Sequence, residues 1–230
     1  MDFLTTPLPA GWALATWIVA AVLLARSARR APWRLLAEDF RLHGWLGSVF
    51  AIALAWLLSA RLAGGLSLHL LLTPLVALMF GRHLAVVAAV PALAAVLLWH
   101  GGDWTGAGAT WLLAAWLPAS VLDALRLAAD RWVPRNPFTF IFLAGFFSPG
   151  AAYVATVFAA FAAHHAAGTA AWPALADGFL PFGLLLAWGE AFLSGLLTAI
   201  FTVYEPRWMA TFDDARYLKP PPRRDGGPRA

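Results

Sequence analysis

The sequence predicts an all-α integral membrane protein of about seven transmembrane helices, and three observations support this. Of the 230 residues, 61% are hydrophobic and only 12% are charged, whereas soluble domains average roughly 45–50% and about 25%. The net charge of +4 comes from basic residues that lie between hydrophobic runs and not along one face, which argues against a nucleic-acid partner. The 13 Trp and 16 Phe fit the aromatic belts of a lipid bilayer.

Seven apolar segments, separated by Gly, Pro or charged residues, have about the length of a membrane-spanning helix. Crossing roughly 30 Å of hydrocarbon takes about 20 mainly apolar residues. In chain order the predicted helices are Leu8–Ala25, Leu42–Ala60, Leu66–Phe80, Leu84–Trp99, Thr110–Leu127, Phe138–Ala163 and Phe179–Tyr204. The third and fourth are short, so residues 66–99 are alternatively a re-entrant hairpin. Irregular backbone at membrane depth survives only against protein or a cavity, which makes this pair the first place to look for a site.

The distribution of basic residues predicts an external amino terminus and a cytoplasmic carboxyl terminus. With seven crossings in this orientation, Arg61 is the only basic residue left outside. Cytoplasmic loops of membrane proteins carry an excess of Lys and Arg. Met1-Asp2-Phe3-Leu4 carries an acid where a cleavable signal peptide carries positive charge, so we expect the first helix to be retained.

Two regions follow from the composition. Residues 1–218 form the predicted polytopic membrane domain, and residues 219–230 form a basic, Pro- and Gly-rich cytoplasmic tail. The tail lacks apolar residues that could dock it, so we expect it to be disordered. Because the chain has no cysteine, disulfides and cysteine chemistry are excluded.

Glu190 is the only acidic residue deep inside a hydrophobic segment. A carboxylate at that depth costs about 2.5–3.5 kcal/mol, so it needs a partner, a water-filled cavity or a proton. One interpretation is a transport, coupling or proton-relay position. The other is a structural carboxyl, protonated or paired with Arg or Trp, that locks two helices together.

His69 lies just inside the predicted outer end of the third segment. Neutral imidazole is well suited to bind Co²⁺, Ni²⁺, Cu²⁺ or Zn²⁺, although a lone histidine between helices is more readily a satisfied polar residue. Further outer-side candidates are His100, His164, His165, Asp103 and Asp177, and none of their spacings is that of a strong metal site. His43 and His83 fall on the cytoplasmic side.

Small residues recur every fourth position along the last predicted helix. They are Ala187, Ala191, Gly195 and Ala199. Such a stripe lets two helices approach closely, either within the chain or against a membrane partner. The chain contains no Walker A loop, no Gly-x-Ser-x-Gly and no His-Glu-x-x-His, so we expect no enzyme activity, and any ATP-driven step belongs to another subunit.

Two stretches resemble the permease, or substrate-capture, components of energy-coupling factor transporters for cobalt and nickel, the CbiM and NikM type. They are residues 67–81, which begin with Ser67-Leu68-His69-Leu70, and residues 189–208, which begin with Gly189-Glu190-Ala191. The resemblance implies a coupling transmembrane subunit and ATPase subunits as partners. It also implies a multi-pass protein of the inner membrane, with a divalent transition metal as substrate and no tightly bound cofactor.

By this resemblance His69 takes a metal-ligand position and Glu190 the position of the acid in the last helix. Members of the family begin Met-His and complete the metal site with the terminal amine and that histidine. This chain begins Met1-Asp2, so Met1 and Asp2 are the corresponding candidate ligands. A carboxylate in place of imidazole lowers the preference for Ni²⁺.

Three hypotheses follow. The first is a subunit that captures a divalent metal ion from outside and works with a coupling protein and ATPases. The second is a non-transporting assembly or regulatory protein that would bind a partner membrane complex. It would use residues 213–218, the small-residue stripe of the last helix and a similar stripe formed by Ala151, Ala155, Ala159 and Ala163. The third, an intramembrane enzyme, requires Glu190 to face a histidine.

Overall fold

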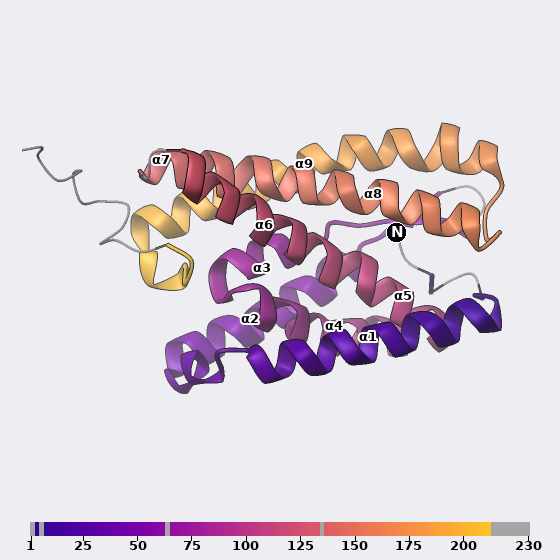
Figure 1. Cartoon of the computed structure of the whole chain (residues 1–230), viewed down its shortest axis with the longest axis horizontal. Coiled ribbons are helices and arrows are strands. Elements are labelled where there is room, and N and C mark those ends of the chain that lie inside the picture. Colours follow the sequence, from indigo (N-terminus) through magenta and orange to yellow (C-terminus); the bar gives the residue numbers. More distant parts are fainter. Residues whose placement is uncertain (1–2, 5–6, 63–64, 134–135, 213–230) are drawn as a thin grey trace, which may run out of the picture.

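The computed structural model describes residues 3–4, 7–62, 65–133 and 136–212. In this part of the chain six helices are long and apolar enough to cross a membrane, and they lie along the long axis of the molecule (Figure 1). They cover Ala10–Arg30 (α1), Asp39–Leu57 (α2), Arg82–His100 (α4), Trp104–Trp132, Pro137–Ala166 and Ala174–Tyr204. The prediction of an all-α membrane protein is confirmed.

The last three long helices are composite. The first consists of the 3₁₀ turn Trp104–Gly106 (η3), Ala107–Trp111 (α5), the π-helical Leu112–Trp116 (η4) and Leu117–Trp132 (α6). The second joins Pro137–Thr139 (α7), the π-helical Phe140–Phe147 (η5) and Ser148–Ala166 (α8). The third joins the π-helical Ala174–Phe179 (η6) to Leu180–Tyr204 (α9). Two 3₁₀ segments, Trp33–Ala37 (η1) and Pro206–Trp208 (η7), follow α1 and α9.

The predicted third helix differs from the rest because its first half is extended. Ser67–Leu68 (β2) pairs antiparallel with Ala60–Arg61 (β1), and the helix Thr73–Phe80 (α3) begins only after Leu72. Pro74 in the first turn of α3 favours this start, because its missing N–H would be unsatisfied there in any case. All eight residues of α3 are buried. The sequence run is uniformly apolar, so hydrophobic periodicity alone could not separate its extended half from its helical half.

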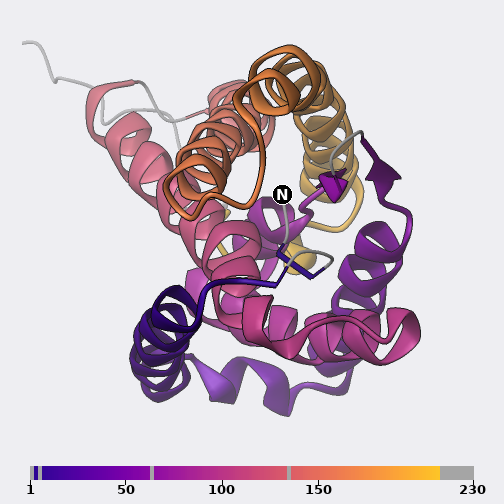
Figure 2. The ribbon, with the colours of Figure 1, turned by 90° about the vertical axis from the view of Figure 1, so that its right-hand side faces the viewer.

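The helices surround this unusual segment. Figure 2 looks along the bundle from the end at which α1 begins, and it shows the helices around the chain that leads into α3. The core around it is closely packed: Leu78 of α3 and Leu84 and Ala88 of α4 are completely buried. The short helix therefore sits against protein, as irregular backbone at membrane depth requires.

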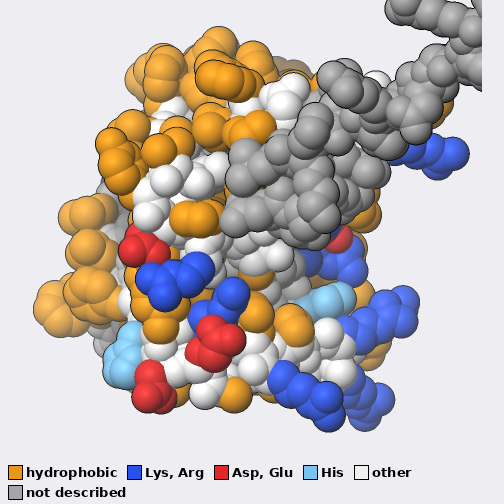
Figure 3. Space-filling view, turned by 90° about the vertical axis from the view of Figure 1, so that its left-hand side faces the viewer, with side chains coloured by type: hydrophobic (Ala, Val, Ile, Leu, Met, Phe, Trp, Pro, Cys, Tyr) orange, Lys and Arg blue, Asp and Glu red, His pale blue; other side chains and the backbone are white. Residues whose placement is uncertain are grey.

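The two ends of the bundle differ in charge. Arg61 lies at the end where α1 begins, whereas the other described arginines lie at the opposite end, called the basic end below. Figure 3 faces the basic end and shows Arg side chains mainly over the lower half of this face. Arg126 there is held by Asp123 at 3.0 Å and by Asp130 at 3.3 Å. The predicted tail, residues 219–230, lies outside the described residues.

The chain after α9 folds back onto the basic end of α3. The main-chain N–H of Ala210 donates to the carbonyl of Met79 at 2.9 Å, and the Thr211 hydroxyl donates to the carbonyl of Leu78 at 2.6 Å. Carbonyl groups in the last turn of a helix have no partner within it. The segment after α9 supplies those partners.

Candidate functional site

The main chain of residues 69–72, called the clamped segment below, is held by three side chains from three helices. Trp56 of α2 donates its indole N–H to the carbonyl of Leu71 at 3.2 Å. Tyr153 of α8 donates its hydroxyl to the carbonyl of His69 at 2.8 Å. Glu190 of α9 accepts the main-chain N–H groups of Leu71 and Leu72, each at 2.9 Å. Segments far apart in the sequence thus meet at a four-residue stretch.

Glu190 is completely buried, and each of its two carboxylate oxygens accepts one main-chain N–H. The sequence predicted that a carboxylate at this depth needs a partner, a cavity or a proton, and these two hydrogen bonds supply the partner. The partners are neither Arg nor Trp but two backbone amides that directly precede α3. These amides need an acceptor from outside α3, because N–H groups at the start of a helix have none within it.

The clamped segment also contains unusual backbone. Leu72 has φ of 56°, and it is the only non-glycine residue with a positive φ in the described part of the chain. A non-glycine residue held in this region costs of order 1–3 kcal/mol and persists only where its surroundings enforce it. The carboxylate of Glu190 and the hydroxyl of Tyr153 are part of those surroundings.

The imidazole of His69 lies inside this arrangement and is 2% exposed. Its Nδ1 lies 3.1 Å from the carbonyl oxygen of Leu70. Its ring centroid is 5.4 Å from that of Trp56. Imidazole nitrogen is a common ligand of divalent transition metals in proteins.

Phe3 and Leu4, near the amino terminus, are buried in the bundle. Phe3 is 1% exposed, its N–H donates to the Thr110 hydroxyl at 2.9 Å, and its ring stacks on His164 at 3.9 Å. Leu4 lines one cavity together with Trp56, the residue that contacts His69. The predicted ligands Met1 and Asp2 lie outside the described residues.

That cavity has a volume of about 360 Å³ and lies at the end of the bundle where α1 begins. Polar side chains contribute to its wall. They are Ser59, Arg61, Ser67, His100 and Asp103. Trp56, whose ring centroid lies 5.4 Å from that of His69, also lines this cavity.

The remaining predicted polar residues are scattered. His164 is buried and its Nδ1 is 2.8 Å from the Thr169 hydroxyl, whereas His165 is exposed beside Trp172. Asp103 caps the following turn through the N–H of Thr105 at 2.8 Å. Within the described ranges there is no group of three or more His, Cys, Asp or Glu side chains that could hold a metal ion.

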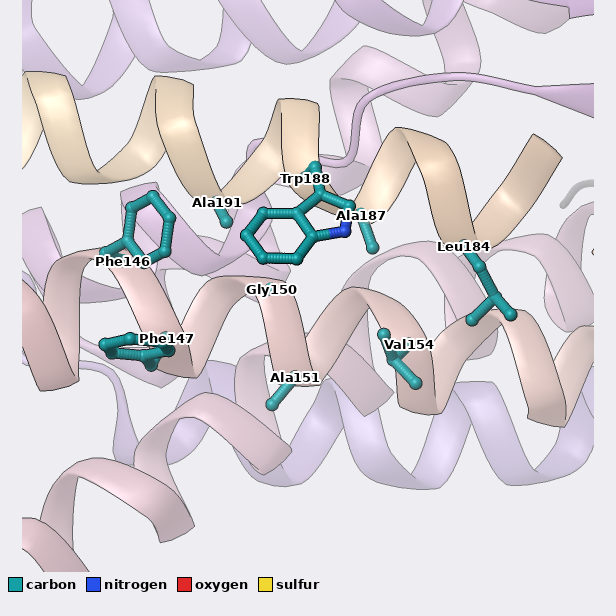
Figure 4. Close-up of a pocket in the computed structure, with 9 residues that line it drawn as sticks. All are labelled: Phe146, Phe147, Gly150, Ala151, Val154, Leu184, Ala187, Trp188 and Ala191. Atoms are coloured by element: carbon teal, nitrogen blue, oxygen red, sulfur yellow. The ribbon is translucent and has the colours of Figure 1, made fainter. Parts of the chain in front are cut away.

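The small-residue stripe of α9 packs inside the chain over most of its length. Ala187 and Ala191 are buried, and a Cβ on Gly195 would lie 2.9 Å from the ring of Phe146 in η5. Ala199 is half-buried. Between α8 and α9 lies an apolar groove of about 340 Å³, which Ala187, Ala191, Gly150 and Trp188 help to line (Figure 4). It lacks charged residues among those that line it, in contrast to the cavity near His69.

Sequence reasoning did not identify Trp56 and Tyr153 as part of the site. The available signal was the presence of polar-tipped aromatic residues inside apolar runs. Buried Tyr and Trp usually find a hydrogen-bond partner. Here that partner is the main chain of the clamped segment.

Residues 6–208 match the model of the family described as CbiM, cobalt uptake substrate-specific transmembrane region. No curated protein and no solved structure matches the chain. Because the match spans most of the sequence, it confirms the resemblance found in the segments around His69 and Glu190. The chain belongs to the CbiM family of cobalt uptake substrate-specific transmembrane regions.

Proposed function

We propose that this protein is the substrate-capture subunit of an energy-coupling factor transporter in the inner membrane, and that it takes up a divalent transition metal ion, with Co²⁺ as the preferred substrate. The observation that carries the proposal is the buried imidazole of His69 on a main-chain segment that three helices hold in place. Such support fits a ligand whose position must be fixed before the ion arrives.

The end of the bundle where α1 begins faces outward in this proposal, and the basic end faces the cytoplasm. The arginine distribution supports this orientation, since Arg61 alone among the described arginines lies at the outward end. The polar cavity lined by Ser67, His100 and Asp103 then opens to the outside and leads toward the Trp56–His69 contact.

The metal ion is the substrate and not a resident cofactor. His69 supplies an imidazole nitrogen, while the amine of Met1 and the carboxylate of Asp2 are the further ligands that we propose. The burial of Phe3 beside His164 and Thr110 supports this, because it carries the amino-terminal segment into the bundle. An oxygen ligand from Asp2 favours Co²⁺ over Ni²⁺ relative to an all-nitrogen site.

The protein performs no covalent chemistry in this proposal, and a separate transmembrane coupling subunit with ATPases supplies the energy. The sequence carries no nucleotide-binding motif. The described hydrogen bonds of Glu190 run to the backbone N–H groups of Leu71 and Leu72, which gives no support to an intramembrane enzyme.

Isothermal titration of the purified full-length protein with Co²⁺, Ni²⁺, Cu²⁺ and Zn²⁺ tests metal capture. The His69→Ala variant is expected to lose at least about 100-fold in Co²⁺ affinity, because it removes a direct ligand. The matched control is His165→Ala, an exposed histidine elsewhere at the same end. No metal binding by the wild type, or binding that is indifferent to His69, would refute the proposal.

Cellular uptake separates transport from the alternative, a non-transporting assembly protein. Deletion of the gene is expected to reduce Co²⁺ accumulation, and the wild-type chain is expected to restore it while His69→Ala does not. Co-purification with a membrane complex that lacks an ATPase, together with unchanged metal uptake in the deletion strain, would favour the assembly protein instead.

A further inference from the structure

We propose that Glu190 is a positioning residue for metal capture: its carboxylate fixes the backbone of residues 71–72 and thereby places the imidazole of His69. This inference rests on the proposed function, and it assigns Glu190 a role different from coupling or proton relay. The geometry behind it is the pair of 2.9 Å hydrogen bonds from the N–H groups of Leu71 and Leu72 to the two carboxylate oxygens.

Both carboxylate oxygens of Glu190 take part in this contact. Glu190 is completely buried, and its hydrogen bonds run to these two main-chain donors, one on each oxygen. A relay position would need a titratable or hydroxyl neighbour in its hydrogen-bond chain. The next buried hydroxyl on the same face of α9, that of Ser194, has no hydrogen-bond partner among the described residues.

One of the two residues that Glu190 holds, Leu72, has the unusual backbone conformation of this segment. Leu72 has the positive φ of 56°, so its conformation must be imposed from outside. The same four residues are held from the other side by the Tyr153 hydroxyl on the His69 carbonyl and by the Trp56 indole on the Leu71 carbonyl. Loss of the carboxylate removes the acceptor of the Leu71 and Leu72 N–H groups. The hydrogen bonds that Tyr153 and Trp56 donate to the carbonyls of this segment remain.

His69 is only two residues from the first amide that Glu190 holds. Its carbonyl, the ring contact with Trp56 and the Nδ1 contact with the Leu70 carbonyl all depend on the same short stretch of backbone. Groups that orient a metal ligand without touching the metal typically change metal affinity 10- to 100-fold when they are lost. Glu190 acts on His69 in this way, through the main chain.

The test compares Glu190→Gln with wild type in the full-length purified protein, with Co²⁺ alone as the probe. Titration gives the Kd, the visible absorption spectrum of bound Co²⁺ reports its coordination geometry, and thermal unfolding without metal reports the fold. A glutamine side chain keeps the shape of glutamate but changes its hydrogen bonding, since the NH₂ group turns a donor toward one backbone N–H. We expect a Kd raised by about 10- to 100-fold and a shifted Co²⁺ spectrum at saturation.

Two further variants sharpen the interpretation. Ser194→Ala is the matched control, one turn along the same buried face, and it is expected to retain the wild-type Kd and spectrum. Tyr153→Phe removes the donor to the His69 carbonyl and keeps the Glu190 side chain, and it is also expected to weaken Co²⁺ binding. If Glu190→Gln does not yield folded protein, Tyr153→Phe decides, because wild-type affinity and spectrum in that variant would overturn the positioning mechanism.

The outcomes also separate this inference from the proposed function. Glu190→Gln with wild-type Kd and spectrum, while His69→Ala loses binding, overturns the positioning role and leaves metal capture intact. If His69→Ala binds Co²⁺ as the wild type does, the proposed function itself fails. A shifted spectrum in Glu190→Gln with an unchanged unfolding midpoint supports positioning over a purely structural role.

Discussion

Gly106 offers a direct way to displace the amino-terminal segment without changing any candidate ligand. A Cβ at this position would overlap the carbonyl oxygen of Phe3 and would lie 2.6 Å from its carbonyl carbon and 2.8 Å from its Cβ. Ordinary van der Waals contact begins near 3.4 Å. In Gly106→Ala the main chain of Phe3 must therefore move by about 0.8 Å or more, because the packed surroundings have no room to absorb the methyl group.

The cost of this shift has two parts. Overpacking of this kind typically destabilises a protein by about 1–3 kcal/mol. The 2.9 Å hydrogen bond from Phe3 N–H to the Thr110 hydroxyl is also strained, and it is worth about 0.5–1.5 kcal/mol. Since ligand constellations must be held within about 0.5 Å, we also expect Co²⁺ affinity to fall by at least about 10-fold if Met1 and Asp2 are ligands.

The assay combines thermal unfolding without metal and Co²⁺ titration of the purified protein. Gly11→Ala in α1 is the matched control, because a Cβ there meets nothing within 4 Å and Ala favours the helix. The control is expected to keep its affinity for Co²⁺. If Gly106→Ala binds Co²⁺ as tightly as the wild type, the reasoning that places ligands on the amino-terminal segment is refuted.

Two further predictions concern packing around α9 and α3. Gly145→Ala would place a methyl group 2.6 Å from both the Cβ and the Cγ2 of Thr198, so it should lower the unfolding midpoint through a loss of about 1–3 kcal/mol. Because Thr198→Ala removes Cγ2, the double variant should recover part of that loss. A double variant no more stable than Gly145→Ala would contradict this contact. Thr211→Val removes the 2.6 Å hydrogen bond to the Leu78 carbonyl and should lower the free energy of unfolding by about 0.5–1.5 kcal/mol. Denaturant unfolding of the wild type and the variant measures this difference. Equal stability of the two would show that the bond contributes nothing.

The long helices were predictable because their apolar runs match the thickness of a bilayer. The third segment was predictable only as an apolar run. Whether residues 67–72 are helical or extended depends on partners that are remote in sequence, namely Trp56, Tyr153 and Glu190. Local pattern cannot report such partners, since buried strands and buried helices are both continuously apolar.

The sequence predicts which residue types belong to the site, but it does not predict their hydrogen-bond partners. His69 and Glu190 stand out as polar side chains in apolar surroundings, and the cost of burying them signals that each needs a partner. The partners of Glu190 are backbone N–H groups, which every residue except proline carries. They therefore leave no signature in the sequence.

One continuous stretch of chain holds both ends of α3. Glu190 accepts hydrogen bonds from the amides at its start. Ala210 and Thr211 donate hydrogen bonds to the carbonyls at its end. Because an α-helix rises about 1.5 Å per residue, α3 is roughly 12 Å long. Both of its ends are hydrogen-bonded to α9 or to the segment that follows α9. A pull on residues 206–212 at the basic end would therefore reach His69 through two parallel routes, α9 and α3. The last helix is thus connected to the candidate metal segment both directly, through Glu190, and through α3.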